Sequence, residues 1–312
     1  MNWKSVTFHM MTALYFVNSK DAMFPSENLL FAHSSVVDIQ RCVDPMKVND
    51  LPNPVRSRLR GFDTDGQNLR TESCSNVYLY THRLGRRPDL ILKTRDVRVR
   101  PQEPDLLAET VALTWLREKL PVPECRCLHV EGDTQYLLMT LMEGVTGIHP
   151  EALQDPEQLI REFAEGLQTV HALDTASCPL DWRMSRFIPW AEGLIESGAL
   201  DEDIPEGKTR TFLFEKLSDI KEAVPGEEDL VFTHGDYCLP NVMFKESRLS
   251  GYIDLGYAGV GDRYLDLVAA RGTIRRNLGE EWIVPFFQAY GLEEPDPEKL
   301  QAYQKVHDWG FW

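Results

Sequence analysis

The sequence predicts an α+β protein of two lobes, a small β-rich N-terminal lobe over residues 61–144 and a larger, mostly helical C-terminal lobe over residues 145–312. Three observations support this division. The first part alternates short strand-like runs with one helix, and the second part spaces its apolar residues mainly as helices do. Charge divides at the same place: residues 1–144 carry 18 basic and 18 acidic residues, whereas residues 145–312 carry 15 and 31, so the net charge of −16 lies in the second part.

Four short runs rich in β-branched and aromatic residues predict the strands of the N-terminal lobe. They lie within 72–82, 90–93, 127–130 and 136–142. The one helix begins at Pro104-Asp105 and continues through Leu120, because Pro121 cannot extend it. Residues 1–60 precede these elements. Because residues 21–60 have weak periodicity and little apolar clustering, we expect this segment to form a poorly ordered or loosely packed extension.

The second part is expected to be helical, with one β element. Asp155-Pro156 is the expected cap and first residue of a helix. Asn241–Phe244 and Gly251–Asp254 predict a hairpin across the polar segment 245–250. Further helices are expected over 264–276, 280–290 and 296–307.

Composition and charge exclude several classes of protein. Hydrophobic residues are 43% and charged residues 26%, which is typical of a globular chain rather than a disordered one. No apolar run approaches the roughly 18–20 residues that a membrane span requires. The acidic second part would repel nucleic acids and anionic membranes and attract cations, so we predict neither of the first two as partners. The six cysteines have no regular spacing, which favours reduced thiols and a cytoplasmic protein.

One short stretch carries the groups that phosphoryl transfer needs. That reaction requires a carboxylate to orient or deprotonate a hydroxyl, and an amide oxygen and a second carboxylate to hold Mg²⁺. Asp236, Asn241 and Asp254 supply them, since the hairpin would return Asp254 to the side of Asn241. Taken singly, Asp236 could be a turn residue and Asn241 a cap, but their conjunction favours catalysis. We expect His234 to shape the loop rather than to carry a proton.

These segments, with others before and after them, resemble the aminoglycoside 3′-phosphotransferase family. The similar segments are 170–174, 178–181, 228–234, 234–241, 250–256 and 259–267. The Cys-Leu-Pro at 238–240 is more specific to this family than to the choline, homoserine or sugar kinases of the same superfamily. The resemblance covers the chain from about residue 60 to the end. It implies a bilobal, protein-kinase-like fold that binds ATP and Mg²⁺ between its lobes.

The resemblance also implies roles for individual residues. Asp236 resembles the catalytic base, and Asn241 and Asp254 resemble the magnesium ligands. The residues expected at the nucleotide are Lys93 at the phosphates, Glu109 paired with it, Ser73 and Ser75 in the nucleotide-positioning loop, and Thr140 and Met142 in the linker between the lobes. Without the family, Lys93 could equally be a solvated strand end, Glu109 an ordinary helix charge, and the serine segment a plain polar turn.

Aminoglycosides are polycations, which suit an acidic helical lobe. The residues predicted to contact the substrate are Asp201, Glu202, Asp203, Arg263, Arg271 and Asp308. The acidic run at 201–203 could equally be solvated surface charge, and Arg263 with Asp266 resembles a fixed ion pair that is better explained by structure than by catalysis. Two departures from the family concern the substrate. Gly272 stands where an acidic residue faces the drug, and residues 307–312 replace an acidic-aromatic ending.

The sequence therefore predicts an ATP-dependent O-phosphotransferase that acts on a hydroxyl of a small cationic molecule, with an aminoglycoside, and hence antibiotic resistance, as the first candidate. One alternative is a kinase for another amino alcohol or sugar. A second alternative, from a different class, is a non-catalytic nucleotide-binding protein of the same fold. We expect a monomer or a homodimer.

Overall fold

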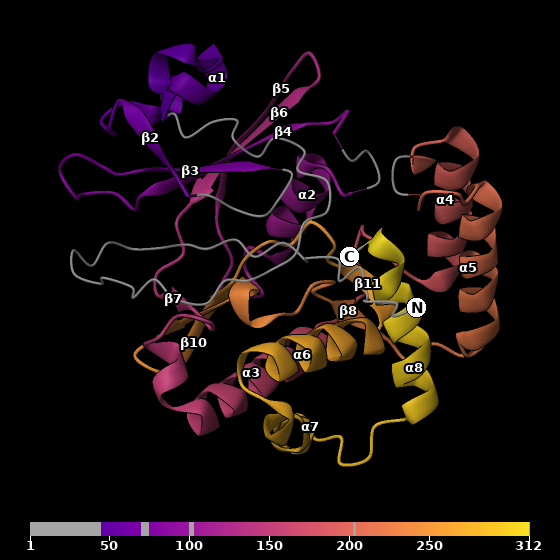
Figure 1. Cartoon of the computed structure of the whole chain (residues 1–312). Helices are drawn as coiled ribbons and strands as arrows, with labels where there is room; N and C mark the ends of the chain where they lie inside the picture. Colours follow the sequence, from indigo (N-terminus) through magenta and orange to yellow (C-terminus); the bar gives the residue numbers. More distant parts are fainter. Residues whose placement is uncertain (1–44, 70–74, 100–102, 202–203, 312) are drawn as a thin grey trace.

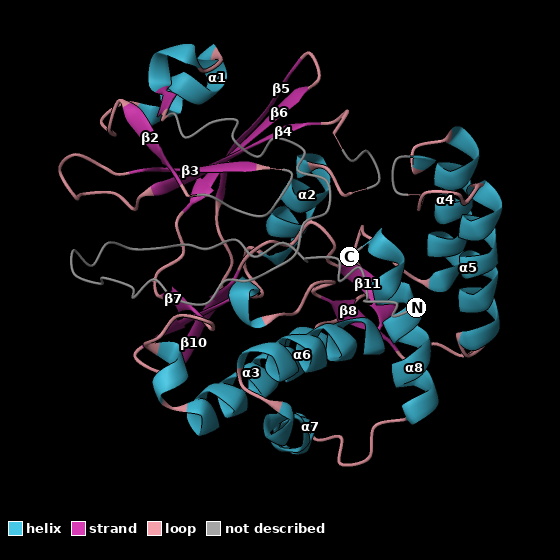
Figure 2. Ribbon diagram, viewed as in Figure 1, coloured by secondary structure: helices cyan, strands magenta, loops and turns pink. Residues whose placement is uncertain are grey.

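The computed structural model describes residues 45–69, 75–99, 103–201 and 204–311 of the chain (Figure 1). The strands of its largest sheet gather in the upper lobe of the view and most of the helices in the lower one (Figure 2). A helix long and apolar enough to cross a membrane is absent from the described ranges.

A six-stranded antiparallel sheet forms the N-terminal lobe, with strand order β1-β2-β3-β4-β6-β5. The strands are β1 (Met46–Lys47), β2 (Asp65–Asn68), β3 (Asn76–Tyr80), β4 (Leu90–Asp96), β5 (Cys125–Glu131) and β6 (Thr134–Thr140). Helix α2 (Leu106–Leu116) packs against β5 and β6. Its first turn is capped by the Asp105 carboxylate, which accepts a hydrogen bond from the Ala108 N–H. The helix ends before the predicted Leu120, because residues 117–120 tighten into a turn that precedes Pro121.

The expectation that residues 1–60 are loosely packed is wrong for residues 45–60; residues 1–44 lie outside the described part of the chain. Helix α1 (Asn53–Arg56) and the flanking turns place Leu51, Val55 and Leu59 against the sheet, where they are 3%, 0% and 2% exposed. These residues recur every four positions, which is the spacing of one helix face. The signal is short and interrupted by prolines, so composition alone did not reveal it.

The described residues of the C-terminal lobe form six longer helices and two small sheets. The helices are α3 (Pro156–His171), α4 (Met184–Ser197), α5 (Arg210–Ala223), α6 (Tyr264–Asn277), α7 (Ile283–Tyr290) and α8 (Pro297–Val306). Helix α3 packs on α7, and α6 packs on α8. The strands are β7 (Val145–Thr146), β8 (Leu230–Thr233), β9 (Val242–Lys245), β10 (Arg248–Tyr252) and β11 (Gly259–Asp262), joined as β10-β9-β7 and β11-β8. The predicted boundary between the lobes after Gly144 stays a prediction.

The predicted hairpin forms, but its turn is shorter than expected. Strands β9 and β10 are joined by Glu246 and Ser247 alone, whose φ angles are 53° and 60°. A two-residue turn of this left-handed kind normally uses Asn or Gly, so the sequence lacked the usual signal. A bulge between Leu249 and Gly251 shifts the register. The hydrogen bond from the Ile253 N–H to the backbone carbonyl oxygen of Asn241 (3.0 Å) closes the hairpin at its base.

Candidate active site

The loop that carries Asp236 connects β8 to β9 and is held by its own backbone. Gly235 has φ +83°, and a Cβ atom there would overlap the backbone carbonyl of Tyr257. The Cys238 N–H donates to the backbone carbonyl oxygen of Asp236, and the Asn241 N–H donates to the backbone carbonyl oxygen of Cys238, both at 2.9 Å. These turns place Asp236 and Asn241 on the same side of the loop.

Asp266, in the first turn of α6, holds the start of this loop. Its carboxylate is fully buried and accepts the backbone N–H groups of His234 (2.7 Å) and Gly235 (2.8 Å). The expected pairing of Asp266 with Arg263 is wrong, because Arg263 lies before the helix and bonds the Asp229 carboxylate instead (Nε–Oδ2 2.6 Å). Sequence reasoning missed this role of Asp266. Its only signal was an acidic residue within an otherwise apolar first turn.

Asp236 is a buried carboxylate with one free oxygen. It is 5% exposed; its Oδ2 accepts a hydrogen bond from the Asn241 amide (2.8 Å), and its Oδ1 has no hydrogen-bond partner within the described part of the chain. Burial, and then the negative charge of Asp254, raise the pKa of Asp236 to about 7. A carboxylate that titrates near neutral pH can accept a proton from a hydroxyl.

His234 is fully buried and makes hydrogen bonds within the loop. Its Nε2 donates to the Ile253 carbonyl (3.1 Å), so its Nδ1 can accept the Asp236 N–H (3.3 Å). Burial lowers the pKa of His234, which favours this neutral ring. Both of its nitrogen atoms are therefore occupied in shaping the loop.

Lys93, Glu109 and Asp254 form a buried ion cluster between the lobes. The Lys93 ammonium lies 2.7 Å and 2.9 Å from the two Glu109 oxygens and 3.0 Å from Asp254 Oδ1. Burial raises the pKa of Glu109, and the charge of Lys93 opposes this rise. The ion pair foreseen between Lys93 and Glu109 is thus present, and it connects β4 and α2 to the segment after β10. Their role at the nucleotide stays a prediction.

The oxygen atoms expected to hold Mg²⁺ fit that ion. Asn241 Oδ1 is buried without a hydrogen-bond partner, and the Asp254 side chain is 22% exposed. The backbone bond from Ile253 to Asn241 keeps the two residues side by side. Magnesium takes oxygen ligands, usually one or two from the protein with the rest from water and phosphates. An unpaired amide oxygen beside a carboxylate matches this requirement.

The residues predicted along the nucleotide are tied into the sheet and the linker. Ser75 is buried at the start of β3, and Ser73 lies outside the described residues. Thr140 ends β6, and its hydroxyl accepts the Glu124 N–H (2.8 Å). Met142 lies against Gly251 of β10. The linker is therefore anchored on both lobes, and the nucleotide contacts of these residues stay predictions.

The residues predicted to contact the substrate, as far as the structure describes them, do not form one cluster. Asp201 makes a bidentate ion pair with Arg210 (2.5 and 2.6 Å), and Glu202 and Asp203 lie outside the described residues. Gln304 bridges two others, since Arg271 Nη2 donates to its oxygen and its amide donates to Asp308, both at 2.9 Å. Arg263 is committed to Asp229 and to the Tyr290 hydroxyl. Their contacts with an acceptor stay predictions.

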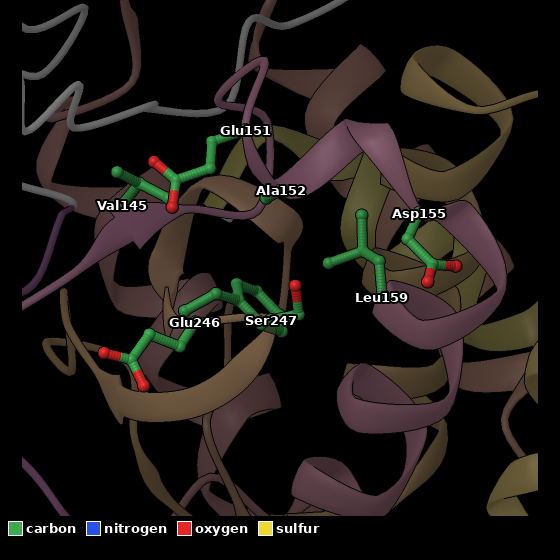
Figure 3. A pocket seen from close by; sticks show the side chains of 8 residues that line it. Val145, Glu151, Ala152, Asp155, Leu159, Glu246 and Ser247 are labelled. Carbon is green, nitrogen blue, oxygen red and sulfur yellow. The ribbon is translucent and has the colours of Figure 1, made fainter.

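A separate small pocket lies between β7, the β9–β10 turn and the start of α3. None of the predicted site residues lines it. Its acidic side chains, Glu151, Asp155 and Glu246, point in different directions (Figure 3), and Asp155 caps α3. The pocket therefore has no convergent set of ligands.

A family profile described as the phosphotransferase enzyme family matches residues 71–303. This chain belongs to that family. It is 38% identical over 206 residues to an aminoglycoside 3′-phosphotransferase of Niallia circulans, which covers 65% of this chain and 78% of the relative. It is 32% identical over 239 residues to one of Enterococcus faecalis, covering 75% and 89%. These matches confirm the resemblance drawn from the loop and hairpin.

Solved structures of the family confirm the predicted fold class. A crystal structure of an aminoglycoside 3′-phosphotransferase of type VIII superposes with a TM-score of 0.69 at 24% identity, covering 84% of this chain and 98% of that one. An aminoglycoside phosphotransferase from Streptomyces rimosus, in complex with ADP and streptomycin, has a TM-score of 0.58 at 21% identity, covering 75% and 90%. The chain has the bilobal, protein-kinase-like α+β fold of these phosphotransferases.

Proposed function

We propose that this protein transfers the γ-phosphoryl group of ATP to a hydroxyl group of an aminoglycoside, with Asp236 receiving the hydroxyl proton. The observation that carries the proposal is the buried Asp236 carboxylate, whose Oδ1 has no hydrogen-bond partner and whose pKa is raised to about 7. Two relatives named aminoglycoside 3′-phosphotransferase, at 38% and 32% identity, support the acceptor class. The ADP and streptomycin complex of a structurally similar protein is consistent with both ligands.

In this mechanism, the acceptor hydroxyl donates a hydrogen bond to Asp236 Oδ1. Its oxygen then bonds to the γ-phosphorus, in line with the oxygen that bridges the β- and γ-phosphorus atoms. The bond between this bridging oxygen and the γ-phosphorus breaks, and ADP leaves. The hydroxyl proton passes to Asp236. Asn241 keeps the other carboxylate oxygen occupied, so the free oxygen is aimed at the acceptor. Most of the rate enhancement would come from this positioning.

Lys93 would bind the phosphate oxygens, held in place by Glu109. The ammonium is shared between Glu109 and Asp254 in this structure, so its contact with Asp254 is the one that phosphates would replace. Asn241 and Asp254 would hold Mg²⁺, which when bound with the nucleotide neutralises charge on the phosphate oxygens. A protein that only bound nucleotide would have no chemical need for the free carboxylate oxygen of Asp236.

A second candidate acceptor is a small amino alcohol with fewer ammonium groups than an aminoglycoside. Helix α6 favours it, because a Cβ atom added at Gly272 would meet no atom of another described part of the chain within 4 Å, and Arg271 and Arg275 lie on the same helix. Two adjacent cations would weaken the attraction of a polycation on that side.

The test is ADP release from Mg²⁺-ATP across a panel of aminoglycosides and simple amino alcohols, with the phosphorylated product identified by mass. We expect turnover that depends on an aminoglycoside and disappears in Asp236→Ala without loss of ADP binding. Asp219→Ala, which removes an exposed carboxylate from α5, is the matched control and should retain turnover. Near-normal transfer by Asp236→Ala would contradict the assignment of the base, and turnover only with simple amino alcohols would favour the second candidate.

A further inference from the structure

We propose that Tyr290 and His171 are positioning residues for the catalytic loop, and that they connect a surface ion pair to the carboxylate of Asp266. The predicted effect on catalysis rests on the proposed function, whereas the contacts described below are independent of it. They run from Asp229 through Arg263, Tyr290 and His171 to Asp266, and of these side chains only Arg263 is among those predicted to contact the substrate.

The direction of each hydrogen bond follows from the chemistry of its partners. Asp266 Oδ2 lies 3.0 Å from His171 Nε2, and a carboxylate can only accept, so Nε2 carries the proton. When the ring is neutral, Nδ1 is an acceptor, and the Tyr290 hydroxyl, 2.7 Å away, donates to it. The same hydroxyl oxygen is left free to accept from Arg263 Nη1 at 3.0 Å. Arginine therefore donates to tyrosine, tyrosine to histidine, and histidine to aspartate.

This series of hydrogen bonds joins separate helices at the base of the site. His171 ends α3, Tyr290 ends α7, and Asp266 lies in the first turn of α6. His171 and Tyr290 are 9% and 5% exposed, so water does not readily replace their bonds. The outer end is different, because the Asp229 side chain is 47% exposed. Hydrogen bonds in series polarise one another, and the Arg263 cation at the outer end makes the tyrosine a stronger donor to the histidine.

The consequence concerns the orientation of the histidine ring. Without the Tyr290 hydroxyl, Nδ1 loses its donor, and only the bond from Nε2 to Asp266 still orients the ring. A ring that is held at one nitrogen can tilt and displace the Asp266 carboxylate. Asp266 also holds the His234 and Gly235 N–H groups, so a shift of its carboxylate moves the loop that carries Asp236. Misplacement of a catalytic group by about 1 Å can lower the rate by up to roughly 100-fold.

The nucleotide side of the site should respond much less. Lys93 and Glu109 lie on β4 and α2, and neither takes part in the series of hydrogen bonds from Asp229 to Asp266. We therefore expect Tyr290→Phe to lower kcat about 3- to 10-fold, with the KM for ATP changed less than about twofold. A purely structural role would reduce the active fraction and the melting temperature but would leave kcat per ADP-binding site unchanged.

The decisive experiment compares Tyr290→Phe with Tyr264→Phe in the full chain. Tyr264 is equally buried, and its hydroxyl accepts the Asp296 N–H at the start of α8, away from the loop. Two readouts are needed: kcat per ADP-binding site, and amide hydrogen exchange of residues 234–241. We expect the lower kcat and faster exchange in Tyr290→Phe only. The Tyr290 effect should also shrink to less than about twofold in a His171→Gln background, because the two residues act in series.

Three outcomes would overturn the proposal. These are unchanged exchange of residues 234–241 in Tyr290→Phe, equal effects of the two phenylalanine variants, and additive effects of Tyr290→Phe and His171→Gln. The exchange readout needs no acceptor, so it decides the positioning role even if no acceptor of the panel is phosphorylated. That last result would remove the proposed function instead.

Discussion

Replacing Asp236 with asparagine should remove phosphoryl transfer and, at the same time, stabilise the folded protein above neutral pH. Burial, and then the charge of Asp254, raise the pKa of this carboxyl group from its ordinary 3.8 to about 7 in the folded chain. One pKa unit corresponds to about 1.36 kcal/mol, so ionising this group in the fold costs about 4 kcal/mol relative to an unfolded chain. An amide has the same shape and no charge, and its oxygen can still accept the Asn241 hydrogen bond.

The sign of the pH dependence follows from the direction of the shift. A carboxyl group with a raised pKa binds its proton more tightly in the folded state, so its stabilising contribution is present below the unfolded value and is lost as the pH rises through about 7. At about pH 8 the variant should be more stable than the natural protein by up to about 4 kcal/mol. At about pH 5 the natural protein keeps its proton, and the difference should shrink to about 1.5 kcal/mol.

The assay is urea unfolding of both proteins at the two pH values, without nucleotide or divalent cation. Other ionisable groups are shared by the two chains, so their contributions cancel in the difference. The reasoning is refuted if Asp236→Asn is no more stable than the natural protein at the higher pH. It is also refuted if the gain is the same at both pH values, because the gain would then come from packing rather than from charge.

Three further predictions follow from the same contacts. The kcat/KM should fall as the pH drops below about 7, because Asp236 becomes protonated; a flat profile between about pH 6 and 8 would exclude it as the base. Glu109→Gln should weaken ADP binding roughly 10-fold in calorimetry, because Lys93 would lose its ion pair with the carboxylate on α2; unchanged affinity would show that Glu109 does not orient the lysine. Leu59→Ala should lower the free energy of unfolding by about 2–5 kcal/mol in urea titration, because it opens a cavity under α1, and a loss below about 0.5 kcal/mol would indicate that this segment is not part of the cooperative fold.

Features that depend on neighbours in the chain were predictable. Asp236, Asn241 and Asp254 come together through one loop and one hairpin, and their spacing showed that before any fold was known. The pairing of Lys93 with Glu109 was predicted through the family resemblance, since the residues alone left Lys93 equally a solvated strand end and Glu109 an ordinary helix charge. In the first case a local element determines which side chains meet.

Features that depend on the choice between distant partners were not predictable. Asp266 and Arg263 are three residues apart, yet one faces the buried loop and the other faces Asp229 at the surface. The contact between His171 and Tyr290 joins residues 119 positions apart on two helices, and no motif links them. The packing of residues 45–60 was missed for a related reason. The burial of such a short apolar helix face can be predicted only when the sheet that it packs against is known.

The charge balance of the cleft connects these observations. Among the described residues at the site, Asp236, Asp254 and Glu109 are carboxylates, and Lys93 is the cation within 3.0 Å of two of them. Asp236 has no such cation, which is why burial and the charge of Asp254 raise its pKa. A site with this excess of negative charge favours a divalent cation at the phosphates and an ammonium-bearing acceptor. The excess of negative charge that makes Asp236 costly to ionise would therefore also attract the cationic ligands that the reaction needs. The stability gained by Asp236→Asn at high pH measures the free-energy cost of that ionisation.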